Sequence, residues 1–134
     1  MRLFIAGVLS FIVGIMSYIL TLKLVWNESL GGDTYAVLYW GGFAFFVIAF
    51  PIYLLTIKFI DFISFKHKYI FYPLSCMLIF FVPTSFITIS LGGTFNIFSA
   101  EAILFHSFFL SAGLVFGLTI WILRRKKGLV NILK

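Results

Sequence analysis

The sequence predicts an all-α integral membrane protein, a four-helix bundle with an N-in/C-in arrangement. Three observations lead to this prediction: apolar residues make up 63% of the 134 residues, charged residues only 10%, and the apolar residues fall into four long runs. A soluble domain carries roughly 25% charged residues. A water-soluble fold of this length leaves much of its surface exposed and could not bury all of these apolar side chains. We therefore expect lipid to cover them.

The four runs cover residues 3–22, 35–57, 69–91 and 102–123. About 20 helical residues cross a hydrocarbon core of about 30 Å, so each run is long enough to cross once. Helices are expected because each backbone amide must find its partner within its own segment, and the runs lack the alternation of barrel strands. The first run exceeds the apolar stretch of a signal peptide and no small-residue cleavage site follows Leu22, so we expect it to be retained. Residues 1–134 then form one transmembrane domain.

Basic residues indicate the orientation of the four spans. Only Lys23 lies on one side, whereas nine lie on the other: Arg2, Lys58, Lys66, Lys68, Arg124, Arg125, Lys126, Lys127 and Lys134. This bias predicts a multi-pass protein of the cell membrane with both termini in the cytoplasm. The net charge of +6 is then a topology signal, and no nucleic-acid partner is expected. The basic run 124–127 fits a stop-transfer flank or, alternatively, a patch for anionic lipid headgroups.

Small and hydroxylated residues occupy one face of the first span. They are spaced by three and four positions, which places them on one narrow helical stripe: Gly7, Ser10, Gly14, Ser17 and Thr21. The fourth span carries Gly113 and Gly117 in a G-x-x-x-G arrangement. Such faces let helices approach closely. We favour packing within the bundle, and the alternatives are a homo-oligomer seam or a polar-lined path. The second span is expected to serve packing alone.

Three further residues inside or beside the spans are candidates for function. Pro83 removes a backbone hydrogen bond and predicts a kink, with a gating hinge as the alternative. His106 is the clear ionisable group within a span, and Glu101 lies at the boundary of the same span, five residues away and therefore on a different face. His106 is expected to be neutral and bonded to a hydroxyl or carbonyl of another span. The alternative is a proton-sensitive group.

The connection between the second and third spans is basic and partly apolar. We expect Asp61 to pair with Lys58 or to be solvated, and residues 58–68 to lie as a short amphipathic piece on the inner leaflet. Chemistry-bearing residues are few: one cysteine and two histidines, with no carboxylate pair inside a span. Catalysis needs a nucleophile or base beside a partner, and zinc needs a fuller ligand set. We therefore expect no enzyme, no metal and no cofactor.

The third span, with "YPLSCMLIFFVP", and the fourth, with "FSAEAILFHSFFLSAGLVFG", resemble a group of uncharacterised small four-span membrane proteins of Bacillus-type bacteria. That resemblance implies bacterial inner-membrane residence and carries no activity. Small multidrug exporters and fluoride channels share only size and span count, and the first span lacks the carboxylate expected of such an exporter.

The leading functional hypothesis is an accessory, immunity-type or regulatory membrane component. It would act within the lipid bilayer, through helix–helix contacts with a second copy of itself or with another membrane protein. The alternative is a small ion channel or transporter that functions as an oligomer, with hydroxyls of the first span lining the path.

Overall fold

Eight helical segments follow one another along the chain in a computed structural model that describes residues 2–29, 31–63, 67–92 and 100–132. They are α1 (Arg2–Trp26), η1 (Gly31–Asp33), α2 (Thr34–Ala44), the π-helix η2 (Phe45–Ala49), α3 (Phe50–Ile63), α4 (Lys68–Leu78), α5 (Phe81–Gly92) and α6 (Ala100–Ile132). No strand occurs in these ranges, which confirms the predicted all-α class. Among the residues that the structure describes, four stretches are long and apolar enough to cross a membrane: Leu3–Trp26, Thr34–Ile63, Lys68–Phe86 and Ala102–Arg125. We call them spans 1 to 4.

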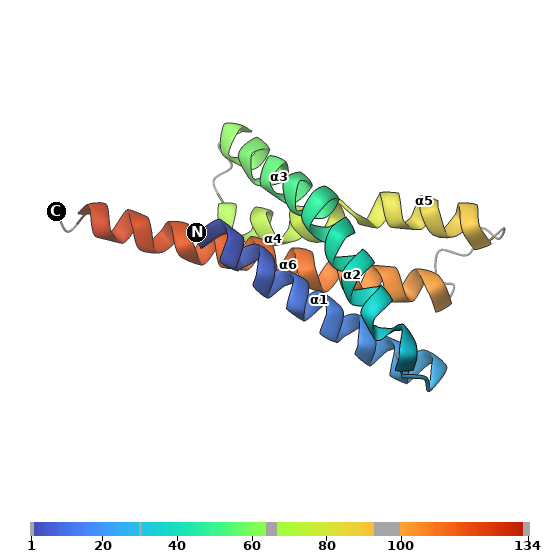
Figure 1. Cartoon of the computed structure of the whole chain (residues 1–134). Helices are drawn as coiled ribbons and strands as arrows, with labels where there is room; N and C mark the ends of the chain where they lie inside the picture. Colours follow the sequence, from blue (N-terminus) through green and yellow to red (C-terminus); the bar gives the residue numbers. More distant parts are fainter. Residues whose placement is uncertain (1, 30, 64–66, 93–99, 133–134) are drawn as a thin grey trace.

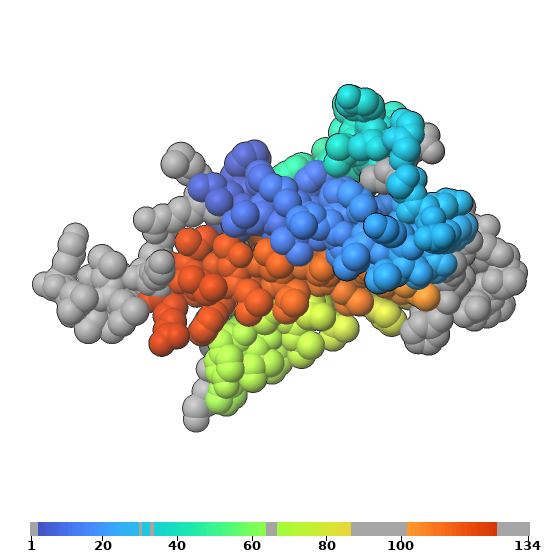
Figure 2. Space-filling model, turned by 90° about the horizontal axis from the view of Figure 1, so that it is seen from below, coloured from blue at the N-terminus to red at the C-terminus, as the bar shows by residue number. Residues whose placement is uncertain are grey.

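Helix α6 is the centre of the bundle. Its 33 residues correspond to a length of about 50 Å, and it packs along α1 on one side and α4 on the other. The space-filling view shows these three helices as successive layers (Figure 2). The continuous stretch α2–η2–α3 crosses them obliquely (Figure 1). The C-terminal end of α3, the N-terminal end of α4 and the C-terminal half of α6 lie toward the same end of the bundle as the N-terminus of α1 (Figure 1), and we call it the basic end.

Glycines bring α6 into backbone contact with α4. A Cβ added at Gly113 would collide with the carbonyl group of Cys76, and one at Gly117 would collide with the backbone of Pro73. Lipid tails are as apolar as the helices, so the hydrophobic effect does not drive helices together in a membrane. Close van der Waals packing does so instead. The G-x-x-x-G pair therefore positions span 4 on span 3.

The glycines of α1 make room for rings rather than for backbone. A Cβ at Gly7 would lie 2.6 Å from the ring of Phe50, and one at Gly14 would lie 2.9 Å from the ring of Phe108. Phe108 is buried and belongs to a core cluster of mostly aromatic and small side chains. The two glycines thus seat one ring from span 2 and one from span 4.

Span 2 is less regular than expected. Its middle turn is a π-helix, in which the N–H of Phe50 donates to the carbonyl of Phe45, and Pro51 follows directly. The expectation of an in-plane piece over residues 58–68 is wrong for its first half. Helix α3 continues unbroken to Ile63, so residues 58–63 are the last turns of span 2.

Span 3 is interrupted at Ile79 and Phe80, which form a turn between α4 and α5. Pro83 lies four residues after Ile79. Since proline has no N–H and its ring crowds the carbonyl four residues earlier, an interruption at this place follows from its chemistry. The structure thus locates the irregularity of span 3 one turn before Pro83.

Candidate functional site

Helix α2 forms one end of the bundle together with α5 and the first turns of α6, and we call it the open end because α2 is loosely packed there. None of the 11 residues of α2, all of which the structure describes, is buried. Tyr39 and Trp40 are 70% and 65% exposed. In α3, the other half of the same span, Tyr53, Ile57 and Ile60 are buried. Span 2 therefore packs firmly through one half only.

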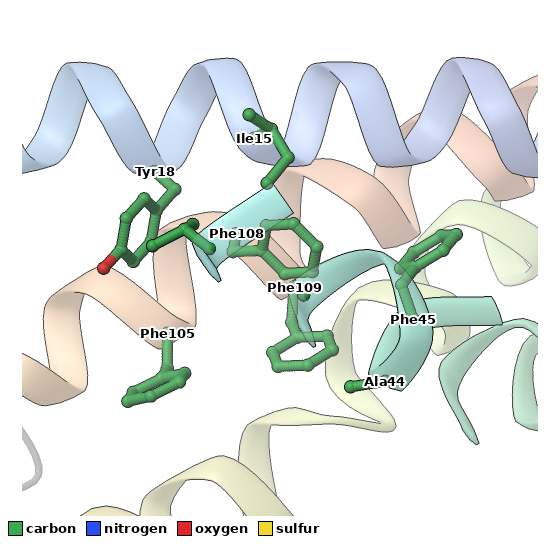
Figure 3. A pocket seen from close by; sticks show the side chains of 9 residues that line it. Ile15, Tyr18, Ala44, Phe45, Phe105, Phe108 and Phe109 are labelled. Atoms are coloured by element: carbon green, nitrogen blue, oxygen red, sulfur yellow. The ribbon is translucent and has the colours of Figure 1, made fainter. Parts of the chain in front are cut away.

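A groove, which we call the lateral groove, lies where α2 and η2 meet α6. It consists of two adjoining cavities of about 230 and 310 Å³, which share Ala44, Phe105 and Phe109 as lining. The first cavity also touches α1 through Ile15 and Tyr18, and the close view shows their side chains directed toward the phenylalanines of α6 (Figure 3). The groove is apolar and lies within the spans, so its natural contents are hydrocarbon or another apolar group.

The second cavity adjoins a polar pair that links α5 to α6. Thr84, which lines this cavity, donates its hydroxyl to the carbonyl of Phe80 at 2.5 Å, and its Oγ1 lies 3.0 Å from Nδ1 of His106. A threonine hydroxyl has a single proton. Because that proton is directed at Phe80, we infer that Nδ1–H of His106 donates to Thr84. The ring of Phe81 stacks on His106 with centroids 4.8 Å apart.

His106 is thus buried against a hydroxyl of another span, which is the arrangement of the first of the two interpretations above. Proton sensitivity of this residue stays a prediction. Glu101 lies in the first turn of α6, and its side chain is outside the described residues.

The predicted seam of span 1 lies against the other spans rather than on a free surface. Ser10 is fully buried and donates to the carbonyl of Ala6 at 2.7 Å, and Thr21 donates to the carbonyl of Ser17 at 2.8 Å. Both hydroxyls are satisfied by their own helix. Together with the glycine contacts described above, this shows that Gly7, Ser10 and Gly14 pack within the chain, whereas Ser17 and Thr21 are partly exposed.

At the basic end, side chains from α3, α4 and α6 meet in a group that we call the Asp61 cluster: Asp61, Lys68, Tyr72 and Arg124. Asp61 accepts from the hydroxyl of Tyr72 and from the guanidinium of Arg124, and Nζ of Lys68 lies 3.3 Å away. Arg124 also donates to the Tyr72 oxygen at 2.7 Å. A charge-assisted network of this kind fixes the relative positions of three helix ends.

The Asp61 cluster corrects the expectation that Asp61 pairs with Lys58 or is solvated, because its partners are Lys68 and Arg124. Arg124 follows Asp61 by 63 residues, so helical spacing along one element could not reveal the pair. One sequence signal did exist. Asp61 is the single acid among nine basic residues assigned to that side, and a lone carboxylate near the membrane needs a partner.

Within the described residues, no three His, Cys, Asp or Glu side chains gather in a way that could hold a metal ion. Comparison with protein-family models, with curated proteins and with solved structures gave no match. The four apolar spans define the class of the molecule, a small multi-pass membrane protein of helical architecture.

Proposed function

We propose that this protein is an accessory, immunity-type or regulatory component of a bacterial cell membrane, with both termini in the cytoplasm. It acts through helix–helix contacts with another membrane protein or with a second copy of itself, and α2 supplies the contact surface. The observation that carries the proposal is that α2 has no buried residue although it continues the firmly packed α3.

The side chains of α2 suit a helix interface. Tyr39, Trp40 and Phe43 contact one another edge to face, with ring centroids 5.4 and 6.3 Å apart. Rigid aromatic side chains provide large contact area at small entropic cost and are enriched at interface centres. Phe43 lies nine residues into the helix, about 14 Å along its axis. This is deeper than the headgroup zone in which aromatic belts lie.

The glycine faces of spans 1 and 4 are engaged in contacts within the chain. Gly113 and Gly117 contact α4, and Gly7 and Gly14 contact rings of spans 2 and 4. The same geometry speaks against a path lined by span 1, since Ser10 is buried and bonded to its own helix. A contact through α2 therefore explains the exposure of this helix, whereas a channel lined by span 1 does not fit the burial of Ser10.

Photo-crosslinking in the native membrane tests this proposal. A benzoylphenylalanine residue replaces Trp40 on α2 in one strain and the equally exposed Met16 on α1 in a control strain. We expect irradiation to give one discrete adduct from position 40, identified by mass spectrometry as a single membrane protein or as a dimer of this chain. Lipid adducts alone at position 40, or the same protein adduct from both positions, would overturn the proposal.

A further inference from the structure

The basic end carries more positive charge than the Asp61 cluster neutralises. Four cations whose side chains the structure describes lie on α3, α4 and α6 at this end: Lys58, Lys68, Arg124 and Arg125. Asp61 is the one carboxylate that faces them among the described residues, so a net charge of +3 remains. Lys58 precedes Asp61 by three positions on the same helix and hence lies on a neighbouring face. The surplus charge is concentrated at one edge of the bundle.

The two cations bonded to Asp61 keep donors for another ligand. A guanidinium has five N–H donors and an ammonium has three. The hydrogen bonds of Arg124 to Asp61 and Tyr72 both come from Nη1, and Lys68 makes one hydrogen bond within the described residues. The Arg124 and Lys68 side chains are 44% and 38% exposed. Both therefore present unused donors at the surface, held close together by the carboxylate that they share.

Aromatic residues beside the cluster mark the level of the lipid headgroups. The rings of Tyr69 and Trp121 lie with their centroids 6.3 Å apart, and the guanidinium of Arg125 lies over the Trp121 ring at 5.6 Å. Tyrosine and tryptophan prefer the boundary between hydrocarbon and water. An anionic group that is abundant at this level is the phosphate of a phospholipid. Arginine is suited to phosphate because its planar fork can donate two parallel hydrogen bonds.

We propose that Arg124, Lys68 and Arg125 form a binding site for the phosphate of an anionic phospholipid at the basic end. Asp61 has two roles in this site. It holds Arg124 and Lys68 together, and its own negative charge weakens their attraction for the phosphate. The site lies at the opposite end of the bundle from α2, so it does not depend on the function proposed above.

Native mass spectrometry of the full chain in detergent tests the site with two lipids of equal chain length. Dioleoylphosphatidylglycerol carries a net negative charge, and dioleoylphosphatidylcholine carries none. We expect the first to bind more tightly, and Arg124→Gln to weaken its binding about fivefold, the effect of one basic side chain near a membrane surface. Lys23→Gln, at the other end of span 1, serves as the control and should change nothing. Equal binding of both lipids, or unchanged binding to Arg124→Gln, would overturn the proposal.

Two further variants separate binding from folding. Asp61→Asn keeps a hydrogen-bond acceptor for Arg124 and Tyr72 but removes the competing charge, so we expect phosphatidylglycerol to bind more tightly even as the protein becomes less stable to heat. The double variant Asp61→Asn/Arg124→Gln leaves no unpaired carboxylate and should still bind weakly. A purely structural cluster would give weaker binding in Asp61→Asn, and that result would contradict the proposal.

The source of the phosphate is decided by competition. Glycerol 1-phosphate has the same anionic group without acyl chains. We expect millimolar glycerol 1-phosphate to leave phosphatidylglycerol bound, because the lipid also gains from its chains in the bilayer-facing surface. Displacement of the lipid by the soluble phosphate would show that the site serves a soluble anion and would overturn the assignment to lipid.

Discussion

The two ends of this bundle are built from the same spans but are held together in different ways. At the basic end, α3, α4 and α6 are joined by a charge-assisted network around Asp61. At the open end, α2 buries nothing, and a polar contact between Thr84 and His106 links α5 to α6. A bundle can thus be fixed at one boundary of the membrane and left available for contacts at the other.

Two backbone irregularities lie between the firmly held basic end and the open end. The π-helix Phe45–Ala49 divides span 2, and the turn at Ile79 and Phe80 divides span 3. Both border the larger cavity of the lateral groove, which Ala49 and Phe80 help to line. Irregular turns of this type are frequent at functional sites and hinges. We infer that the halves of these two spans on the side of the open end can shift while the basic end stays fixed.

The largest effect is expected from adding one methyl group where two helices touch. Gly113→Ala forces α6 away from the Cys76 carbonyl and should lower the free energy of unfolding by about 3 kcal/mol. Gly41→Ala is the matched control, because within the described residues nothing lies within 4 Å of a Cβ built there. Thermal unfolding in detergent measures both. Equal losses would show that the open end is packed as tightly as the rest.

Removal of the central carboxylate should have the next largest effect. Asp61→Ala leaves Arg124 and Lys68 without their counter-charge and is expected to cost about 1 kcal/mol, a modest value because the groups are partly exposed. A double-mutant cycle with Arg124→Ala should give coupling of similar size. Glu28→Ala, an exposed acid at the other end, is the control. Additive losses in the cycle would mean that the pair does not hold the basic end.

A smaller effect is expected from the polar link at the open end. Thr84→Val deletes the hydroxyl near His106, and hydrogen bonds between spans contribute about 0.6 kcal/mol on average. Thr56→Val is the matched control, since Thr56 donates to the carbonyl of Ile52 in its own helix. Unfolding in detergent compares the two. A loss at position 84 no larger than that at position 56 would remove the link from the description of the open end.

The smallest effect on stability is expected on α2 itself. Tyr39→Ala should change the free energy of unfolding by less than about 0.5 kcal/mol, as substitutions outside packed regions do. In the native membrane, the same substitution should reduce the crosslink from position 40, because the neighbouring ring of the contact surface is lost. A large loss of stability in detergent would instead assign Tyr39 to packing within the chain.

The sequence predicted the spans well, because lipid demands long apolar helices whatever their packing. Span 2 illustrates the limit. Its expected end at residue 57 precedes the observed end at Ile63, since the uncharged run stops at Lys58, and the bonds of Asp61 to two other spans cannot be seen in the sequence. The glycine faces indicated close packing but not which helix each one meets. Spacing within one helix carries no information on partners across the bundle.

The candidate site was less predictable for the same reason. The lateral groove depends on a π-helical turn, and Pro51 alone does not predict such a turn. It also depends on the distance between α2 and α6. Neither is a local property of the sequence. His106 was recognisable, because an ionisable residue within a span is costly and needs a partner, but its partner Thr84 lies in another span.

Distance distributions between pairs of spin labels test the difference between the two ends most directly. Labels replace exposed residues on a cysteine-free Cys76→Ala background, with Phe59 and Ile70 marking the basic end and Tyr39 and Phe86 marking the open end. We predict a narrow distribution for the first pair in lipid nanodiscs and a clearly broader one for the second. Distributions of equal width, or a broader one at the basic end, would contradict a bundle that is fixed at one end and open at the other.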